Sequence, residues 1–262
     1  MVPEPERVLF DVPAASYDRL MGRYLPTLAP ALADAAGVTA GSDQRVLDVG
    51  CGPGGLTREL VDRLGPDHVV AIDPSPPFVE TCRERNPGVD VREGVAEHLP
   101  FEDDAVDASL ASLVVGFMTD PHAGVAEMRR VTRPGGRLAL SFWTLDAMPV
   151  LSTFWRAAGA VAGATATDDR RFGRRDGEIA GVLRDVGASD VEQLRLTGRA
   201  TYADLDDFWS SFTGQAGPAG VYLASLPEGV RDRVRDEADR LLGHPRSPFT
   251  LEPEAWCAVG TS

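Results

Sequence analysis

The chain carries the stretch V-L-D-V-G-C-G-P-G-G-L-T at residues 46–57. The apolar run 46–49 is typical of a buried strand, and it gives way to glycines just before a helical pattern that begins at Leu56. Glycines suit such a turn because a side chain would hold the backbone away from a ligand, and because the turn can require positive φ values. The stretch therefore predicts a strand, a ligand-binding loop and a helix.

Two kinds of ligand fit a loop of this type. Residues 50–55 satisfy the dinucleotide pattern G-x-G-x-x-G, and Asp73 follows at about the spacing of a ribose-binding acid. Two residues count against a pyrophosphate: Asp48 places a carboxylate at the strand end, and Pro53 removes a backbone N–H that an anion could use. An acid at this point favours a cationic ligand group.

The sequence V-L-D-V-G-C-G-P-G at 46–54 closely resembles the first motif of class I S-adenosylmethionine-dependent methyltransferases. Weaker similarity extends over most of the chain, to small-molecule methyltransferases of the ubiquinone and menaquinone biosynthesis type. The resemblance implies S-adenosyl-L-methionine as cofactor and S-adenosyl-L-homocysteine as product. It also implies an α/β fold, a doubly wound, Rossmann-like, mostly parallel sheet of about seven strands whose last strand is antiparallel.

The amino-acid composition limits the classes of molecule that the protein is expected to bind. The chain has 262 residues, 43% of them hydrophobic, and a net charge of −14, which repels nucleic acids and anionic lipid. The sequence therefore predicts a small-molecule acceptor, with no nucleic-acid or membrane partner. The three cysteines lack metal or disulfide spacing, and no signal peptide or membrane span is evident, so a cytoplasmic location is expected. The oligomeric state, monomer or homodimer, is open.

Periodicity along the chain predicts the order of the remaining elements. Strands are expected at 46–49, 68–73, 89–92, 105–113 with an apolar extension over 114–118, 137–143, 191–196 and 249–259. Helices are expected between them, with a glycine turn at 133–136 and a mobile, Arg-rich loop at 168–175. The predicted units are an N-terminal helical lid (1–44), a cofactor-binding core (45–201), a helical cap insert (202–246) and the last core strand (247–262).

The resemblance assigns cofactor contacts to several positions. Asp73 should hold the ribose hydroxyls, although an Asp there also fits a helix N-cap. The segment G-V-A-E-H-L-P-F at 94–101 resembles the family's adenine-binding segment, but Val95 replaces the acid that usually accepts the adenine amino group. The N–H of Ala96 is expected to reach a ring nitrogen of the adenine, and Glu97 is the candidate substitute acceptor for its amino group. The other predicted cofactor-binding residues are Asp48, Gly50, Cys51, Gly52, Gly54, Pro74 and Ser112.

The N-terminal string Y-D-R-L-M-G-R-Y at 17–24 resembles a segment that closes over the methionine end of the cofactor in such enzymes. Tyr17 and Arg23 are accordingly expected to contact the cofactor. The structural alternative is that both lie on the surface of an ordinary helix.

The acceptor side carries less information. Methyl transfer needs no nucleophilic side chain, and the sequence shows neither a hydrolase triad nor metal-ligand spacing, so no metal is expected. His122 is the candidate general base. Phe117 and Trp143, near strand ends, and Trp209 and Phe212, in the cap insert, are the candidate acceptor contacts. The alternative for the insert is that its aromatic residues pack as plain core.

Three functions are compatible with the sequence. The favoured one is in-line methyl transfer to a small-molecule acceptor. A fold relative that binds the cofactor without transferring its methyl group would keep the same cofactor contacts. A nicotinamide oxidoreductase would use the glycines and Asp73 but has no use for Asp48. The sequence does not identify the acceptor or the atom that is methylated.

Overall fold

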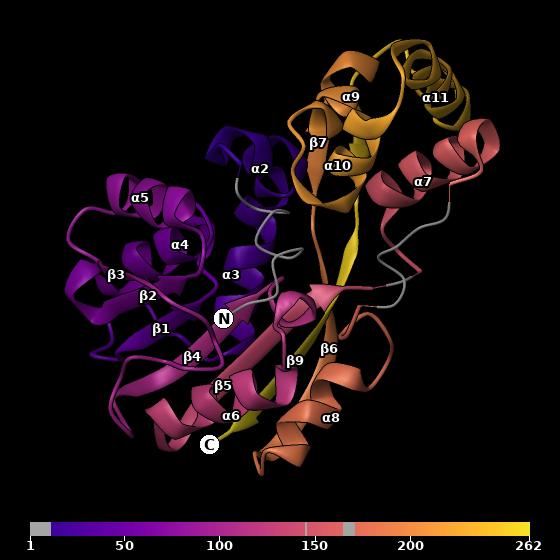
Figure 1. Cartoon of the computed structure of the whole chain (residues 1–262). Helices are drawn as coiled ribbons and strands as arrows, with labels where there is room; N and C mark the ends of the chain where they lie inside the picture. The colour runs from indigo at the N-terminus through magenta and orange to yellow at the C-terminus, as the bar shows by residue number, and fades with distance from the viewer. Residues whose placement is uncertain (1–11, 145, 165–170) are drawn as a thin grey trace.

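The computed structural model describes residues 12–144, 146–164 and 171–262 (Figure 1). The first residues of the chain and residues 168–170 of the expected mobile loop lie outside this description. The rest of that run, 171–177, forms turns before helix α8 (Glu178–Asp185).

A seven-stranded sheet organises the molecule, and only one of its strands runs against the others. In sheet order the strands are β3 (Asp90–Glu93), β2 (Val69–Asp73), β1 (Val46–Val49), β4 (Val106–Ser112), β5 (Thr132–Trp143), β9 (Glu254–Thr261) and β6 (Ser189–Thr197). The order reverses between β1 and β4, which is the point where such sheets bind ligands. The predicted fold class is confirmed, including the antiparallel last strand.

Helices cover both faces of the sheet because the central strands are apolar on both sides. Figure 1 shows α3 (Leu25–Ala35), α4 (Gly55–Leu64) and α5 (Pro76–Arg85) on one face, with α6 (Pro121–Val131) and α8 on the other. Each helix turns an apolar stripe inward, as Leu60 of α4 and Met128 of α6 show by being fully buried. Two hydrophobic cores result, one on each side of the sheet.

The expected extension of the fourth strand over 114–118 is wrong. β4 ends at Ser112, Leu113 adopts a left-handed conformation with φ +62°, and the 3-10 helix η3 (Val115–Phe117) follows. The turn is locked by packing, because a Cβ on Gly116 would lie 2.3 Å from the Phe142 ring. The expected glycine turn at 133–136 lies within β5, where it interrupts the register with β4.

A helical cap stands on the sheet beside β6 and β9. As predicted, the chain between them is mostly helical; it contains α9 (Leu205–Thr213), α10 (Gly217–Ser225) and α11 (Glu228–Leu241). Helix α7 (Pro149–Ala162), which follows β5, packs against α11 and so joins the cap from an earlier part of the chain. The N-terminal helix α2 (Ala14–Leu20) and the 3-10 helix η1 (Gly22–Tyr24) lie against α9 (Figure 1).

The last predicted strand, 249–259, is divided at its proline. β8 (Phe249–Leu251) leaves the main sheet and pairs with β7 (Ala200–Tyr202) in a separate two-stranded sheet, whereas β9 alone enters the main sheet. Pro253 has no N–H to donate to a ladder, and its carbonyl accepts from Gly198 N at 2.8 Å. The two-stranded sheet therefore connects the cap to the core.

Candidate functional site

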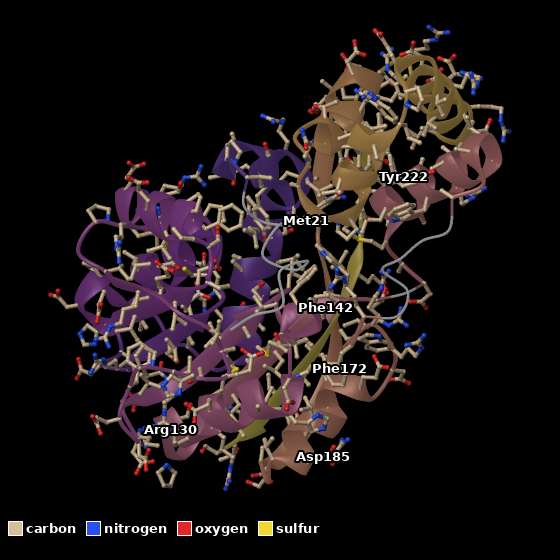
Figure 2. The ribbon with its side chains drawn as sticks, viewed as in Figure 1. Met21, Arg130, Phe142, Phe172, Asp185 and Tyr222 are labelled. Atoms are coloured by element: carbon tan, nitrogen blue, oxygen red, sulfur yellow. The ribbon has the colours of Figure 1, made fainter. Side chains whose placement is uncertain are left out.

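A cavity of about 370 Å³ lies at the carboxyl ends of β1, β2, β4 and β5. Its walls come from three parts of the chain: the N-terminal segment, the loops at the strand ends and the cap helix α10. Figure 2 labels Met21 of the N-terminal segment and Phe142 of β5, which both line the cavity. The position agrees with the rule that open α/β sheets bind ligands at the reversal of strand order.

The glycine loop forms the cavity wall at the end of β1. Gly50 and Gly52 line the cavity and adopt φ values of +70° and +53°, a left-handed conformation that costs energy for other residues. Cys51 is buried. Gly54 faces away from the cavity, and a Cβ added to it would lie 2.4 Å from the amide nitrogen of Asn86. Of the four predicted loop residues, only the two glycines at 50 and 52 therefore reach the cavity surface.

Asp73 joins the glycine loop to the end of β2. One carboxylate oxygen accepts from Gly52 N at 2.8 Å and the other from Ser75 N at 2.9 Å. Burial raises the pKa of Asp73 to about 6, against these two hydrogen bonds that lower it. Each oxygen keeps a lone pair for a ligand hydroxyl. The carboxylate lines the cavity and also accepts from Ser75 N, but Ser75 and not Asp73 is the N-cap residue of α5, so the capping alternative does not describe Asp73.

Asp48 lies beneath the loop, 1% exposed, and does not form part of the cavity wall. Its Oδ2 accepts from Thr57 Oγ1 at 2.6 Å, and its Oδ1 has no hydrogen-bond partner among the described residues. Burial raises the pKa of this carboxyl to about 7, and the Thr57 hydroxyl opposes the shift. A buried acceptor without a hydrogen bond costs stability, so this atom sets the Asp48 carboxyl apart from an ordinary structural acid.

The predicted adenine contacts lie together on the wall beyond β2 and β3. Pro74, Ala96 and Glu97 all line the cavity. Glu97 is also tied to the next loop, because its Oε1 accepts from Asp120 N at 3.2 Å. Ser112, at the end of β4, lines the cavity too, and its buried hydroxyl has no partner among the described residues. All four therefore occupy positions compatible with cofactor contact.

The structure separates the two residues predicted in the N-terminal segment. Tyr17 lines the cavity and packs edge-on against Phe78 with the ring centroids 5.5 Å apart. Burial, and next the nearby Asp73 charge, raise the pKa of its phenol. Arg23 does not reach the cavity: it pairs with Asp207 of α9 at 3.0 Å and lies over the Tyr202 ring. Arg23, predicted to contact the cofactor, therefore lies outside the cavity wall, and its charge pairs η1 with the cap.

Of the four residues predicted to contact the acceptor, two line the cavity and two do not. Phe117 and Trp143 line the cavity. Phe212 is fully buried and stacks on Phe154 with the centroids 4.5 Å apart, and Trp209 packs on the same cluster, so both belong to the cap core and not to the cavity wall. The core alternative explains them, because α9 turns its apolar stripe toward α7.

His122 is also outside the cavity. Its imidazole is more than half exposed on α6, where Nε2 lies 3.2 Å from Asp185 of α8. A base must come within hydrogen-bond reach of the proton it removes, and this position does not provide that. The expectation of a base here followed from an extended fourth strand, which the left-handed turn at Leu113 prevents.

Sequence reasoning missed several residues of the cavity wall. Leu20 and Met21 lie inside the string 17–24, of which only Tyr17 and Arg23 were selected; Phe142, Leu151, Arg171 and Arg174 lie outside any motif. The cap also contributes, through Gly217, Pro218 and Ala219 of α10 and not through the aromatic residues of α9. Only tertiary packing brings the positions outside the motifs to the cavity, so no local pattern could have selected them.

Comparisons with known proteins agree with this geometry. A methyltransferase domain model matches residues 47–140. An uncharacterized methyltransferase of Mycobacterium tuberculosis is 44% identical over 103 residues, which are 39% of this chain and 41% of that protein. The matches to the first curated relatives thus span less than half of their length. A demethylmenaquinone methyltransferase of Renibacterium salmoninarum is 33% identical over 180 residues, covering 63% of this chain and 74% of that protein.

The same fold occurs in solved structures. A chain from the complex between the Trm112 methyltransferase activator of Haloferax volcanii and its methyltransferase partner superposes with a TM-score of 0.59. It shares 25% identity and covers 96% of each chain. The similarity therefore includes the cap as well as the sheet.

Proposed function

The chain belongs to the class I S-adenosylmethionine-dependent methyltransferases, in the group of the quinone-biosynthesis enzymes, and on that premise we propose that it methylates a small-molecule acceptor. The cofactor supplies an electrophilic methyl group on a sulfonium, so the protein has to bind, orient and exclude water. The observation that carries the proposal is the buried pair Asp48 and Asp73 around one glycine loop.

Several residues in and around the cavity match particular chemical groups of the cofactor. Asp73 retains acceptor capacity for two ribose hydroxyls, and the Asp48 carboxylate, buried behind the loop, would favour the ammonium through its charge, which also acts on Tyr17 of the cavity wall. Ala96 and Glu97 border the position proposed for adenine. A nicotinamide dinucleotide fits less well, because the same buried charge would oppose its pyrophosphate and because Pro53 offers no backbone N–H in the loop.

The acceptor is proposed to bind beyond the ends of β4 and β5. Phe117 and Phe142 pack edge-on there with their ring centroids 5.5 Å apart, and Trp143 and α10 of the cap also line the cavity. Aromatic walls favour flat, unsaturated rings. The name of the demethylmenaquinone methyltransferase relative supports a quinol-like ring as one acceptor to try.

Calorimetry with three ligands tests the proposal. S-adenosylmethionine and S-adenosylhomocysteine should bind, and NADH should not bind comparably. Asp73→Asn should weaken the binding of S-adenosylmethionine and S-adenosylhomocysteine by about 1–3 kcal/mol each, because charged hydrogen bonds to the ribose are lost. Asp67→Asn, an exposed acid outside the cavity, serves as the matched control and should leave both affinities unchanged.

The comparison has one decisive outcome. If NADH bound more tightly than S-adenosylhomocysteine, the methyltransferase proposal would fail. Transfer itself is checked by mass spectrometry of acceptor mixtures, where a product heavier by one methylene unit distinguishes an enzyme from a protein that only binds the cofactor.

A further inference from the structure

Two of the three cysteines meet behind the glycine loop. Cys51 belongs to the loop itself, and Cys82 lies on α5. The structure holds both as free thiols, which share a hydrogen bond with each other. Both side chains are buried, with exposed fractions of 6% and 0%. The third cysteine, Cys257, lies on β9 in the ladders with β5 and β6.

The backbone of the loop packs directly against Cys82. Gly54 N donates to the Cys51 carbonyl at 3.0 Å, which closes a turn between these two residues. A Cβ added to Gly54 would lie 2.9 Å from Cys82 Sγ and 3.3 Å from Cys82 Cα, so only glycine allows this approach of loop and helix. Two thiols in hydrogen-bond contact can be joined by a disulfide after a small movement of the backbone.

The surroundings of the pair favour ionisation of Cys82. The hydrogen bond from the Cys51 thiol lowers the pKa of the Cys82 thiol, and the side-chain nitrogen of Asn86 also donates to Cys82 Sγ, at 3.7 Å. The same hydrogen bond, and then burial, raise the pKa of the Cys51 thiol. Since the thiolate is the form that attacks an oxidant, Cys82 suits the role of nucleophile and Cys51 that of resolving partner.

The segment that carries Cys51 also carries groups that face the cofactor site. Gly50 and Gly52 line the cavity on either side of Cys51, and Gly52 N donates to the Asp73 carboxylate at 2.8 Å. A covalent bond holds two sulfurs closer together than a hydrogen bond does. A disulfide would therefore shift Cys51 toward α5 and disturb the hydrogen bond that Gly52 makes with the proposed ribose-binding acid.

We propose that Cys51 and Cys82 form a redox-sensitive pair, which hydrogen peroxide oxidises to a disulfide that weakens cofactor binding. The Cys82 thiolate attacks one peroxide oxygen, the O–O bond breaks, and one water leaves once the departing hydroxide is protonated. The Cys51 sulfur then attacks the sulfur of the resulting sulfenic acid, the S–O bond breaks, the S–S bond forms, and a second water leaves. The two thiols lose two electrons and two protons, and the peroxide is reduced to water.

Only the second half of this proposal depends on the proposed function. The weakened cofactor binding rests on it, because it concerns S-adenosylmethionine in the same cavity. The formation of the disulfide depends on the two thiols alone. The two halves are therefore tested by separate measurements.

Peptide mapping of the ligand-free protein tests the disulfide. The chain has no lysine, so trypsin cleaves it only after arginine and places the three cysteines in separate peptides, 46–58, 64–83 and 247–262. After treatment with hydrogen peroxide and alkylation of the remaining thiols, mass spectrometry should find 46–58 joined to 64–83, and dithiothreitol should separate them. Peptide 247–262 should stay alkylated, because burial raises the pKa of Cys257 to about 12.

The map also defines what would contradict the disulfide. A pair that is never joined, whether it stays reduced or is oxidised to sulfinic acids, would overturn the inference. A link through Cys257 would overturn it as well, since that would show unfolding and not a reaction of neighbouring thiols.

Calorimetry tests the effect on the cofactor site. The oxidised protein should bind S-adenosylhomocysteine at least about tenfold more weakly than the reduced protein, as expected when a charged hydrogen bond is lost, and dithiothreitol should restore the affinity. Saturating S-adenosylhomocysteine, added before the peroxide, should slow the cross-link at least about fivefold, because the ligand stabilises the loop in its reduced position. Cys257→Ala is the matched control and should keep both effects.

Cys51→Ala separates the disulfide from other oxidation at the cavity. Met21 and Met118 line the same cavity and are oxidised by peroxide too. Peroxide should leave the affinity of Cys51→Ala at its starting value, and a loss as large as in the unaltered protein would contradict the inference. Equal affinities of the oxidised and reduced unaltered protein would also overturn it. Failure of the reduced protein to bind S-adenosylhomocysteine would count against the proposed function instead, and the peptide map would still decide the disulfide.

Discussion

Asp48 shows how one buried carboxylate can make ligand binding depend on pH. Its pKa, raised to about 7 by burial, lets the ligand-free protein hold a proton there near neutral pH. The positive charge of a ligand ammonium in the cavity favours the ionised form. The protein should therefore release part of a proton near pH 7 when S-adenosylhomocysteine binds, and the affinity should rise as the pH increases from about 6 to 8.

Calorimetry in buffers of different ionisation enthalpy measures that proton release. Asp48→Asn should abolish most of it and keep the Thr57 hydrogen bond. A proton count unaffected by the substitution would move the linkage to another group, with Asp73 the next candidate because its pKa is about 6.

The Asp48 carboxyl should make the folding stability of the ligand-free protein fall as the pH rises, whereas the cofactor affinity rises. Its pKa is 3.8 unperturbed and about 7 in the folded protein, so the folded state binds the proton more tightly. The stability that this proton contributes is fully present below about pH 4 and is lost as the pH rises through 7. Urea unfolding of the ligand-free protein should show this decline between about pH 4 and 7 more strongly than unfolding of Asp48→Asn.

At the scale of the element, the N-terminal segment should respond to the cofactor. Tyr17 lines the cavity whereas Arg23 pairs with the cap, so the segment spans the ligand and α9. Hydrogen exchange over residues 16–24 should slow when S-adenosylhomocysteine is added, because the ligand closes the wall that α2 provides. Exchange in α11, which does not line the cavity, should slow only by as much as the gain in global stability, which makes it the reference for the local effect.

Arg23→Ala separates the two contacts of that segment. It should leave the affinity for S-adenosylhomocysteine unchanged and cost about 0.5–1 kcal/mol of stability, the range for a partly exposed ion pair. Asp207→Ala should cost a similar amount, and the double variant less than the sum. A weaker cofactor affinity in Arg23→Ala alone would restore the role predicted from the sequence.

Helix α9 should behave as core and not as a substrate-binding element. Phe212 is fully buried against Phe154 and Phe208, so Phe212→Ala should lower the free energy of unfolding by about 3–5 kcal/mol. Acceptor preference should not change. Val221→Ala on α10, at 38% exposure, is the control and should cost less than about 0.5 kcal/mol. A changed acceptor preference with unchanged stability in Phe212→Ala would return α9 to the active site.

At the scale of the whole molecule, the cavity joins parts that are distant in the chain. Because its walls come from the N-terminal segment, the core and the cap, a ligand that fills it should oppose unfolding of all three. S-adenosylhomocysteine at 100 times its dissociation constant should add about 2.7 kcal/mol to the free energy of unfolding. Thermal unfolding should remain a single transition that moves upward; two transitions, with only one shifted, would show that the cap unfolds separately.

The sequence predicted what local pattern determines and missed what packing determines. The positions of the strands along the chain followed from periodicity and the glycine loop from residues 46–57, and Asp73 and Tyr17, selected through the family resemblance, both line the cavity. The turn at Leu113 could not be predicted, because an apolar residue with positive φ is held there by its neighbours. Arg174 was missed because its position depends on contacts with residues 30 and 82 positions away.

The two-stranded sheet of β7 and β8 has a consequence for how this protein can diversify. Tyr202 lies opposite Phe249 in that ladder, so the excursion over 203–248 starts and finishes at neighbouring points. The entropy of closing such a loop grows only slowly with its length, so inserts of different sizes could be grafted on this stem. Because β6 and β9 keep their register below it, selection could exchange the portion that meets the acceptor and leave the nucleotide-binding half intact.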